Sequence, residues 1–159
     1  VEAMPEFSVK KLVSMLGEQK AQQYIRYRLD AIDTVEQRSK NECDFQRVSG
    51  FKYSEHLEEK ERLQEERMAA SSVGLITCWH DSLKLPYRSF GFEVKQMGRV
   101  HCMKYLRQLA TDIDNLGGAI FERSHVMGIE GKNPKSVQVN DAHLEFDHIV
   151  FAVHSNYTD

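Results

Sequence analysis

The sequence predicts an α+β fold: helices packed on a mixed sheet, then a helix, a strand, a β-meander and a buried strand. Three observations lead to this prediction. Apolar residues recur at spacings of three and four over residues 18–40, which is typical of an amphipathic helix. Phe90, Phe92 and Val94 alternate with other residues, as in a half-buried strand. Residues 126–153 contain short alternating runs separated by turn residues, which favours a meander.

The composition is that of a globular protein without a strong charge bias. The chain has 159 residues, of which 41% are hydrophobic and 28% charged, with a net charge of −3. That length allows one domain or two small lobes, and the charge argues against a nucleic-acid or membrane-surface binder. No apolar run approaches the ~20 residues that span a bilayer, and no signal-peptide pattern is present. The three widely spaced cysteines suit a reducing compartment, so we predict a cytoplasmic protein.

Two helices are predicted at the start of the chain. Ser8 can accept a hydrogen bond from the free N–H groups of a helix over residues 9–16, and Gly17 can end that helix. The second helix covers residues 18–40. Its apolar stripe consists of Ala21, Ile25, Leu29, Ile32 and Val35. Because the charged side chains lie off this stripe, we expect one face of the helix to pack on the rest of the chain.

A strand and a charged helix are predicted next. Residues 43–53 are rich in strand-forming residues, and Gly50 interrupts their alternation at an expected bulge. Ser54 can cap a helix over residues 55–70. Since most of its side chains are charged, we expect a solvated helix with ion pairs between residues four apart. The alternative is a partner-binding or coiled-coil helix, although no heptad is sustained. Residues 71–84 are expected to be a connection.

The second half of the chain has more sharply marked boundaries. In order, its predicted segments are a helix over 103–116 ended by Gly117 and Gly118, a short strand at 119–122, a strand at 126–130, a turn at 131–134, and a hairpin turning at Asn140 and Asp141. The continuous apolar run at residues 148–153 is typical of a strand covered on both faces.

The cysteine and histidine spacing does not indicate a metal centre. Cys78 and His80 place two possible ligands close together, but a structural zinc site needs four. We therefore predict no metal site and an ordinary structural role for these residues. Cys102, beside His101 at the start of a helix, could be a reactive thiolate, but an ordinary thiol is the expectation.

Four segments of the chain resemble sequence strings of a known family, and they follow one another along the chain as in that family. Gly-Gly-Ala-Ile-Phe-Glu at residues 117–122 is similar to a Gly-Gly-x-Ile-Phe-Glu string of FAD-dependent glycine and D-amino-acid oxidases, and residues 43–53, 98–109 and 151–158 resemble further strings of that family. The match is closest to a bacterial branch that often carries a Rieske domain, although this chain has no Rieske Cys/His pair. The resemblance implies a parent enzyme that oxidises the C–N bond of an amine or amino acid by hydride transfer to flavin.

The resemblance also implies positions for cofactor contacts. The strand that holds Val126 would hydrogen-bond the FAD adenine through its backbone. Ala152, Val153 and His154 would pass close to the ribose and pyrophosphate. Val153 and His154 replace a more common Thr-Gly or Thr-Asn, and a bulky side chain there would crowd a phosphate.

Substrate contacts are predicted from the same comparison. Arg47, Lys52 and Tyr53 are candidates for a substrate-facing wall on a sheet that roofs the flavin, and exposed strand positions are the alternative. His101 would lie where the chain crosses back to the FAD lobe, either as a functional residue or as a satisfied hinge residue. The spacing of serine, histidine and carboxylate residues along the sequence does not identify a catalytic residue.

Residues 1–100 are thus predicted to be a helical and substrate-domain-like region, and residues 101–159 part of an FAD-binding lobe. None of the nine glycines forms the GxGxxG string that holds a dinucleotide pyrophosphate. We therefore expect an internal fragment that alone binds FAD weakly or not at all and is inactive. The alternative is a non-enzymatic, truncated binding or oligomerisation module that no longer binds FAD and forms a homodimer through its exposed cofactor face.

Overall fold

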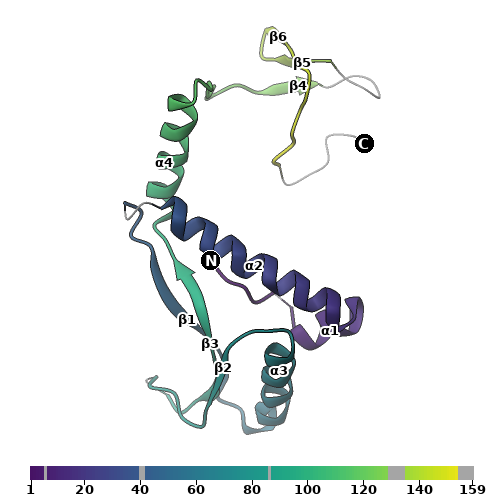
Figure 1. Cartoon of the computed structure of the whole chain (residues 1–159), viewed down its shortest axis with the longest axis vertical. Coiled ribbons are helices and arrows are strands. Elements are labelled where there is room, and N and C mark those ends of the chain that lie inside the picture. Colours follow the sequence, from purple (N-terminus) through teal and green to yellow (C-terminus); the bar gives the residue numbers. More distant parts are fainter. Residues whose placement is uncertain (6, 40–41, 86, 129–134, 154–159) are drawn as a thin grey trace. The chain divides into compact units, whose positions relative to one another are not determined.

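The computed structural model describes residues 1–5, 7–39, 42–85, 87–128 and 135–153, and Figure 1 shows their arrangement in helices and strands. These residues form four α-helices and two three-stranded sheets, which confirms the α+β class. The chain divides into two compact units, Val1–Thr111 and Asp112–Asp159. The division falls within helix α4 (Cys102–Asn115), whereas the predicted border at residue 100 lies just before that helix.

The first unit is built on a small antiparallel sheet. Its strands are β1 (Gln46–Ser54), β2 (Thr77–His80) and β3 (Phe90–Arg99), in the order β1-β3-β2. Both outer strands run opposite to β3, so every described pair is antiparallel and the expected mixed pairing is wrong for this sheet. Gly91 allows β1 to approach closely, because a Cβ there would lie 2.7 Å from the Cα of Tyr53.

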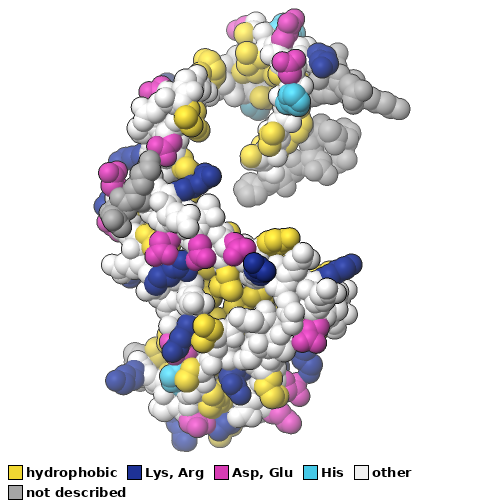
Figure 2. Space-filling model, viewed as in Figure 1, with side chains coloured by type: hydrophobic (Ala, Val, Ile, Leu, Met, Phe, Trp, Pro, Cys, Tyr) yellow, Lys and Arg dark blue, Asp and Glu magenta, His cyan; other side chains and the backbone are white. Residues whose placement is uncertain are grey.

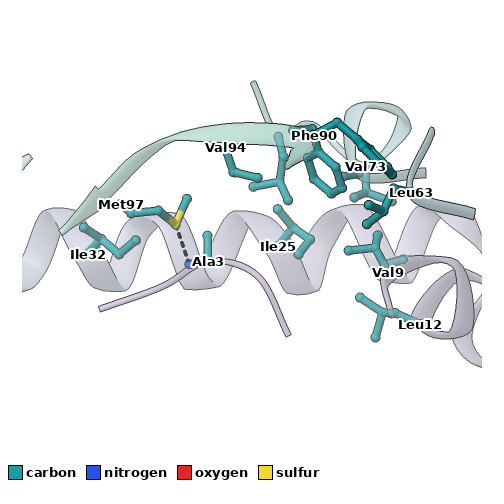
Figure 3. Packing of buried hydrophobic residues seen from close by; sticks show 14 residues of the cluster. Ala3, Val9, Leu12, Ile25, Ile32, Leu63, Val73, Phe90, Val94 and Met97 are labelled. Atoms are coloured by element: carbon teal, nitrogen blue, oxygen red, sulfur yellow. Dashed lines mark hydrogen bonds between the residues drawn. The ribbon is translucent and has the colours of Figure 1, made fainter. Parts of the chain in front are cut away.

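Helices α2 (Glu18–Arg38) and α3 (Lys60–Ser72) cover one face of this sheet, and α1 (Val9–Leu16) packs on these two helices. Figure 3 shows Ile25 and Ile32 of α2 directed toward the strand that carries Val94 and Met97. The predicted apolar stripe of α2 is confirmed by the burial of Ala21, Ile25 and Ile32. The core therefore lies between the helices and β3, a strand whose apolar side chains alternate toward it.

Local capping signals correctly predicted where the first helices start and stop. The Ser8 side chain accepts the Lys11 N–H, and Gly17 follows the last turn of α1 with φ of 75°. The third helix begins later than expected. Ser54 Oγ accepts the His56 N–H, but a 3₁₀ turn at Leu57–Glu59 precedes α3.

The predicted bulge exists, but its extra residue is on the partner strand. Val48 pairs with Met97 and Gly50 pairs with Val94, so one residue of β1 faces two residues of β3. Gln96 adopts φ of 68° within this irregular stretch. Gly50 marks the position of the bulge without being its cause, since Gln96 adopts the left-handed backbone conformation.

The second unit contains a β-meander, and its hairpin is as predicted. Its strands are β4 (Val126–Gly128), β5 (Ser136–Val139) and β6 (Ala142–Glu145), paired antiparallel in that order. Asn140 turns the chain between β5 and β6 with φ of 50°. The predicted turn at 131–134 lies outside the described residues.

The predicted end of helix α4 is confirmed in detail. Gly117 has φ of 81° and donates its N–H to the Asp114 carbonyl, while the Gly118 N–H reaches the Ile113 carbonyl. These two bonds form a Schellman motif, which satisfies carbonyls at the helix end.

Two predicted strands do not form in the described chain. Residues 119–122 are not in a strand, and residues 148–153 are exposed and belong to no strand of the two described sheets. Val150 is 89% exposed, so the prediction of a strand covered on both faces is wrong here. A continuous apolar run becomes such a strand only when neighbouring strands and layers cover it. No helix in the described residues is long and apolar enough to cross a membrane.

Candidate functional site

The open face of the β1-β3-β2 sheet is the candidate functional site. In the paired register, Lys52 lies beside buried Phe92, so both occupy the face that the helices cover. The alternate residues therefore point to the other face, over which no described helix of this unit packs. This open face carries Ser49, Phe51 and Tyr53 from β1, Cys78 and His80 from β2, and Glu93 from β3.

Glu93 is the centre of a polar cluster on the open face. The Ser49 hydroxyl donates to Glu93 Oε1 over 2.5 Å, and His80 Nε2 lies 3.2 Å from Glu93 Oε2. The His80 ring is tilted against Phe51, with 6.1 Å between the ring centroids. The hydrogen bond from Ser49, and then that with His80, lower the pKa of the Glu93 carboxyl below its ordinary value. Glu93 is consequently an ionised carboxylate beside aromatic rings.

A pair of tyrosines extends this surface. The hydroxyls of Tyr53 and Tyr87 are 3.0 Å apart, and their rings are tilted with centroids 6.3 Å apart. The hydrogen bond with Tyr53 raises the pKa of Tyr87 above its ordinary value. The Tyr87 phenol therefore remains a protonated donor and acceptor near neutral pH.

Arg47 lies next to that cluster, on the side where β1 meets α2. Its guanidinium is bound to Asp33 and Glu36 and donates to the Gln96 carbonyl over 3.1 Å. The hydrogen bond to Glu36 contributes most to raising the pKa of Arg47. Figure 2 shows basic and acidic side chains next to each other over α2. Arg47 also lines an open hollow of about 730 Å³ with Glu93 and Lys95.

Lys52 and His101 have clear structural partners. Lys52 Nζ is 3.0 Å from Glu66 Oε1 on the helix-covered face. His101 donates its N–H to the Cys43 carbonyl over 2.8 Å, and its Nδ1 lies 3.4 Å from the Lys104 N–H, at the start of α4. Of the four residues predicted to face substrate, Tyr53 lies on the open face, and Arg47 lines a hollow together with Glu93 of that face. Substrate contact by all four stays a prediction.

In the second unit, Val126 lies at a free strand edge. The Asn140 N–H donates to the His125 carbonyl over 2.9 Å, so His125 and Asn140 are a hydrogen-bonded pair. Antiparallel pairs alternate, so the backbone groups of Val126, opposite Val139, point away from β5. An open, mostly apolar hollow of about 590 Å³, lined by Phe121 and Leu144, adjoins Val126 and Val139.

The residues predicted at the cofactor phosphates are only partly described. Ala152 and Val153 are exposed, and His154 lies outside the described residues. The N–H and C=O of Val126, which point away from β5 and pair with no other described strand, fit together with the adjoining apolar hollow one part of FAD, the adenine. Within the sequence no glycine-rich GxGxxG turn is available for the pyrophosphate. The chain therefore fits the adenine contact and not the whole dinucleotide.

The chain is thus a two-unit α+β protein, with a polar and aromatic sheet face in one unit and a free strand edge in the other. A family model described as FAD dependent oxidoreductase (DAO) matches residues 8–156. Since this match covers most of the sequence, the chain belongs to that family of FAD-dependent oxidoreductases. No curated protein and no solved structure gave a match.

The sequence prediction missed most of the open-face cluster because it missed strand β2. Residues 71–84 were expected to be a connection, yet Thr77–His80 pairs with β3 along its whole length. Thr77 and Trp79 are residue types that strands favour, and this was the signal available in the sequence. Glu93 was part of the predicted strand, but nothing in its local pattern indicated that Ser49 and His80 would meet its carboxylate.

Proposed function

We propose that this protein contributes the substrate-facing sheet and part of the cofactor lobe of an enzyme that oxidises the C–N bond of an amine or amino acid. The observation that carries the proposal is the open sheet face, where the ionised Glu93 carboxylate lies beside Phe51 and His80. FAD, when bound, supplies the hydride acceptor in this family. The chain's own residues supply a binding surface.

A protonated amine suits this surface for two reasons. A carboxylate stabilises the ammonium charge, and the neighbouring aromatic face can contact the cation or its apolar substituents. Tyr53 and Tyr87 add hydroxyl groups that can orient a second polar group, such as a carboxylate of an amino acid. The open face therefore offers complementary contacts for both ends of a small amino acid.

The contact of the second unit with FAD is proposed for the adenine. Outward N–H and C=O groups of Val126 can pair with the base edge, and the hollow near Phe121 and Leu144 can take its apolar ring face. Ala152, Val153 and His154 are proposed near the ribose and pyrophosphate on the family resemblance.

The first experiment is the visible absorbance spectrum of the purified protein, before and after addition of FAD and desalting. We expect most of the flavin absorbance near ~450 nm to be lost on desalting, because this sequence offers no GxGxxG turn. In the full-length parent enzyme under anaerobic conditions, glycine or another small amine should bleach the flavin and the matching hydroxy acid should not, whereas this chain alone should be inactive. Bleaching by the hydroxy acid alone would contradict C–N oxidation.

A second candidate function is self-association through an apolar surface. Ile149, Val150, Phe151 and Val153 are between 36% and 89% exposed, an unusual clustering for large apolar side chains in one short run. A homodimer through this proposed cofactor face would bury them. Light scattering should then give a dimer mass that added FAD leaves unchanged, because this alternative is a module that no longer binds FAD. A strict monomer in the absence of FAD would argue against this alternative.

A further inference from the structure

We infer that Cys78, His80 and Glu93 form a binding site for a thiophilic divalent metal ion such as Zn²⁺ on the open face of the β1-β3-β2 sheet. One ligand atom from each residue lies within 4.8 Å of the other two. The spacing of Cys78 and His80 alone does not suggest such a site, because the third ligand comes from another strand.

The sheet register explains why these three side chains converge. Cys78 and His80 are two residues apart on β2, so they point to the same face. Cys78 lies directly opposite Glu93 on β3, and His80 lies diagonally across from it. Neighbouring strands bring such opposite and diagonal side chains within reach of each other. The convergence is therefore a property of the paired backbone, and small side-chain rotations can close the site.

The donor set suits zinc. A thiolate sulfur, an imidazole nitrogen and a carboxylate oxygen are its three usual protein ligands, at about 2.3, 2.0 and 2.0–2.2 Å from the metal. Tetrahedral bonds of those lengths require ligand atoms ~3.3–3.8 Å apart, so a separation of 4.8 Å must shrink by about 1.0–1.5 Å. Three protein ligands leave a fourth position for water, as in zinc sites that remain open to solvent.

The surroundings of Glu93 hold its carboxylate in place for this role. Ser49 donates to Oε1, which leaves Oε2 directed toward His80. Packing of the His80 ring on Phe51 limits its rotation. A metal ion would replace the hydrogen bond between His80 and Glu93, while Ser49 would stay as the outer partner that orients the ligand.

The metal site goes beyond the proposed oxidation and can be tested separately from it. A metal ion and a protonated amine would both bring positive charge to Glu93, so they should compete for this carboxylate. Only the metal needs the Cys78 thiolate. A Cys78→Ser variant should therefore lose metal binding, whereas amine-dependent bleaching of flavin is read on the metal-free wild-type sequence within the parent enzyme, which separates failure of one proposal from failure of the other.

The test is a titration of the full chain with Co²⁺, read by the near-ultraviolet charge-transfer band that a cobalt–thiolate bond produces. Wild type should show the band, and C78S should abolish it. E93Q should weaken binding by more than about 100-fold, the upper range for loss of an outer partner. Cys102→Ser is the matched control, because Cys102 is also an exposed free cysteine. A band that persists in C78S, or none in wild type, overturns the proposal.

A second measurement uses the wild-type protein, so its result does not depend on whether the variants fold. Zn²⁺ should slow alkylation of Cys78 by iodoacetamide and leave the rate at Cys102 unchanged, as quantified by mass spectrometry of the two cysteine peptides. Equal rates at Cys78 with and without saturating Zn²⁺ would show that the thiolate is not a ligand.

Discussion

Replacement of Glu66 by glutamine is expected to destabilise the first unit by about 3 kcal/mol, because it removes a buried carboxylate that several donors share. Glu66 is 4% exposed. It accepts the Ser8 hydroxyl and the Val9 N–H, each over 2.7 Å, and the Lys10 N–H over 3.2 Å. A glutamine has the same size but presents an amide that cannot accept from all of these donors.

This carboxylate completes the start of helix α1. The first N–H groups of a helix have no partner within it, and the positive end of the helix dipole favours a negative charge there. Ser8 caps the Lys11 N–H, and Glu66 of α3 takes the two N–H groups before it. Lys52 of β1 binds the same carboxylate, so one side chain joins two helices and the sheet.

Glu66 should also make the unit sensitive to acid. Burial by itself would raise the pKa of Glu66, but hydrogen bonds from Ser8, Val9, Lys52 and Lys10 outweigh burial and lower the pKa below its ordinary value of 4.5. A lowered folded pKa means that the stabilisation is complete above the unfolded pKa and is lost as pH falls through the folded one. We therefore expect wild type to lose stability below about pH 4.5.

Urea unfolding at pH 7 and at acidic pH measures both effects. Glu65→Gln is the matched control, since Glu65 precedes Glu66 on α3 but is solvent-exposed and binds Lys10. E65Q should leave the unfolding midpoint close to wild type. E66Q should lower it at pH 7 and flatten its dependence on pH between neutral and acid. Equal midpoints for E65Q and E66Q would contradict the role assigned to Glu66.

The burial of Glu66 could not be predicted from the local sequence. The charge pattern of residues 55–70 predicted a solvated helix, and for Lys60–Ser72 as a whole that is largely right, with buried Leu63, Glu66 and Ala70 as exceptions. Nothing in the local pattern distinguishes Glu66 from Glu65. The difference arises because Ser8 and Val9, more than 50 residues earlier, meet one of them. Contacts of that range are set by tertiary packing and leave no local signal.

Local signals were reliable where the cause of structure is local. Helix caps at Ser8 and at Gly117 and the hairpin at Asn140 depend on residues within a few positions, and all three formed as predicted. The apolar run at 148–153 failed because its predicted strand depended on covering layers that the described chain does not provide.

The candidate site was predictable only in part, and strand geometry explains why. Neighbouring residues of a strand point to opposite faces, so Lys52 and Tyr53 could not both line one wall of β1. The family resemblance predicted that Lys52 and Tyr53 lie on a strand, β1, but it did not predict which face of that strand is open. That choice depends on which face the helices cover, and α3 covers the Lys52 face through its bond with Glu66.

The two faces of the sheet are expected to respond very differently to loss of a phenyl ring. Phe92→Ala should cost about 3–5 kcal/mol, because Phe92 is 0% exposed at the centre of the core and its removal leaves a cavity. Phe51→Ala is the matched control on the neighbouring strand. Phe51 is 52% exposed on the open face, so its loss should cost less than about 1 kcal/mol.

Denaturant unfolding of the two variants, followed by circular dichroism, measures this contrast directly. A large loss of stability in both would mean that the supposed open face is covered in solution, for example by another copy of the chain. If the contrast holds, Phe51 is a large apolar side chain that folding does not require. A ring retained beside an ionised carboxylate at such a position is better explained by contact with a ligand than by the stability of the fold.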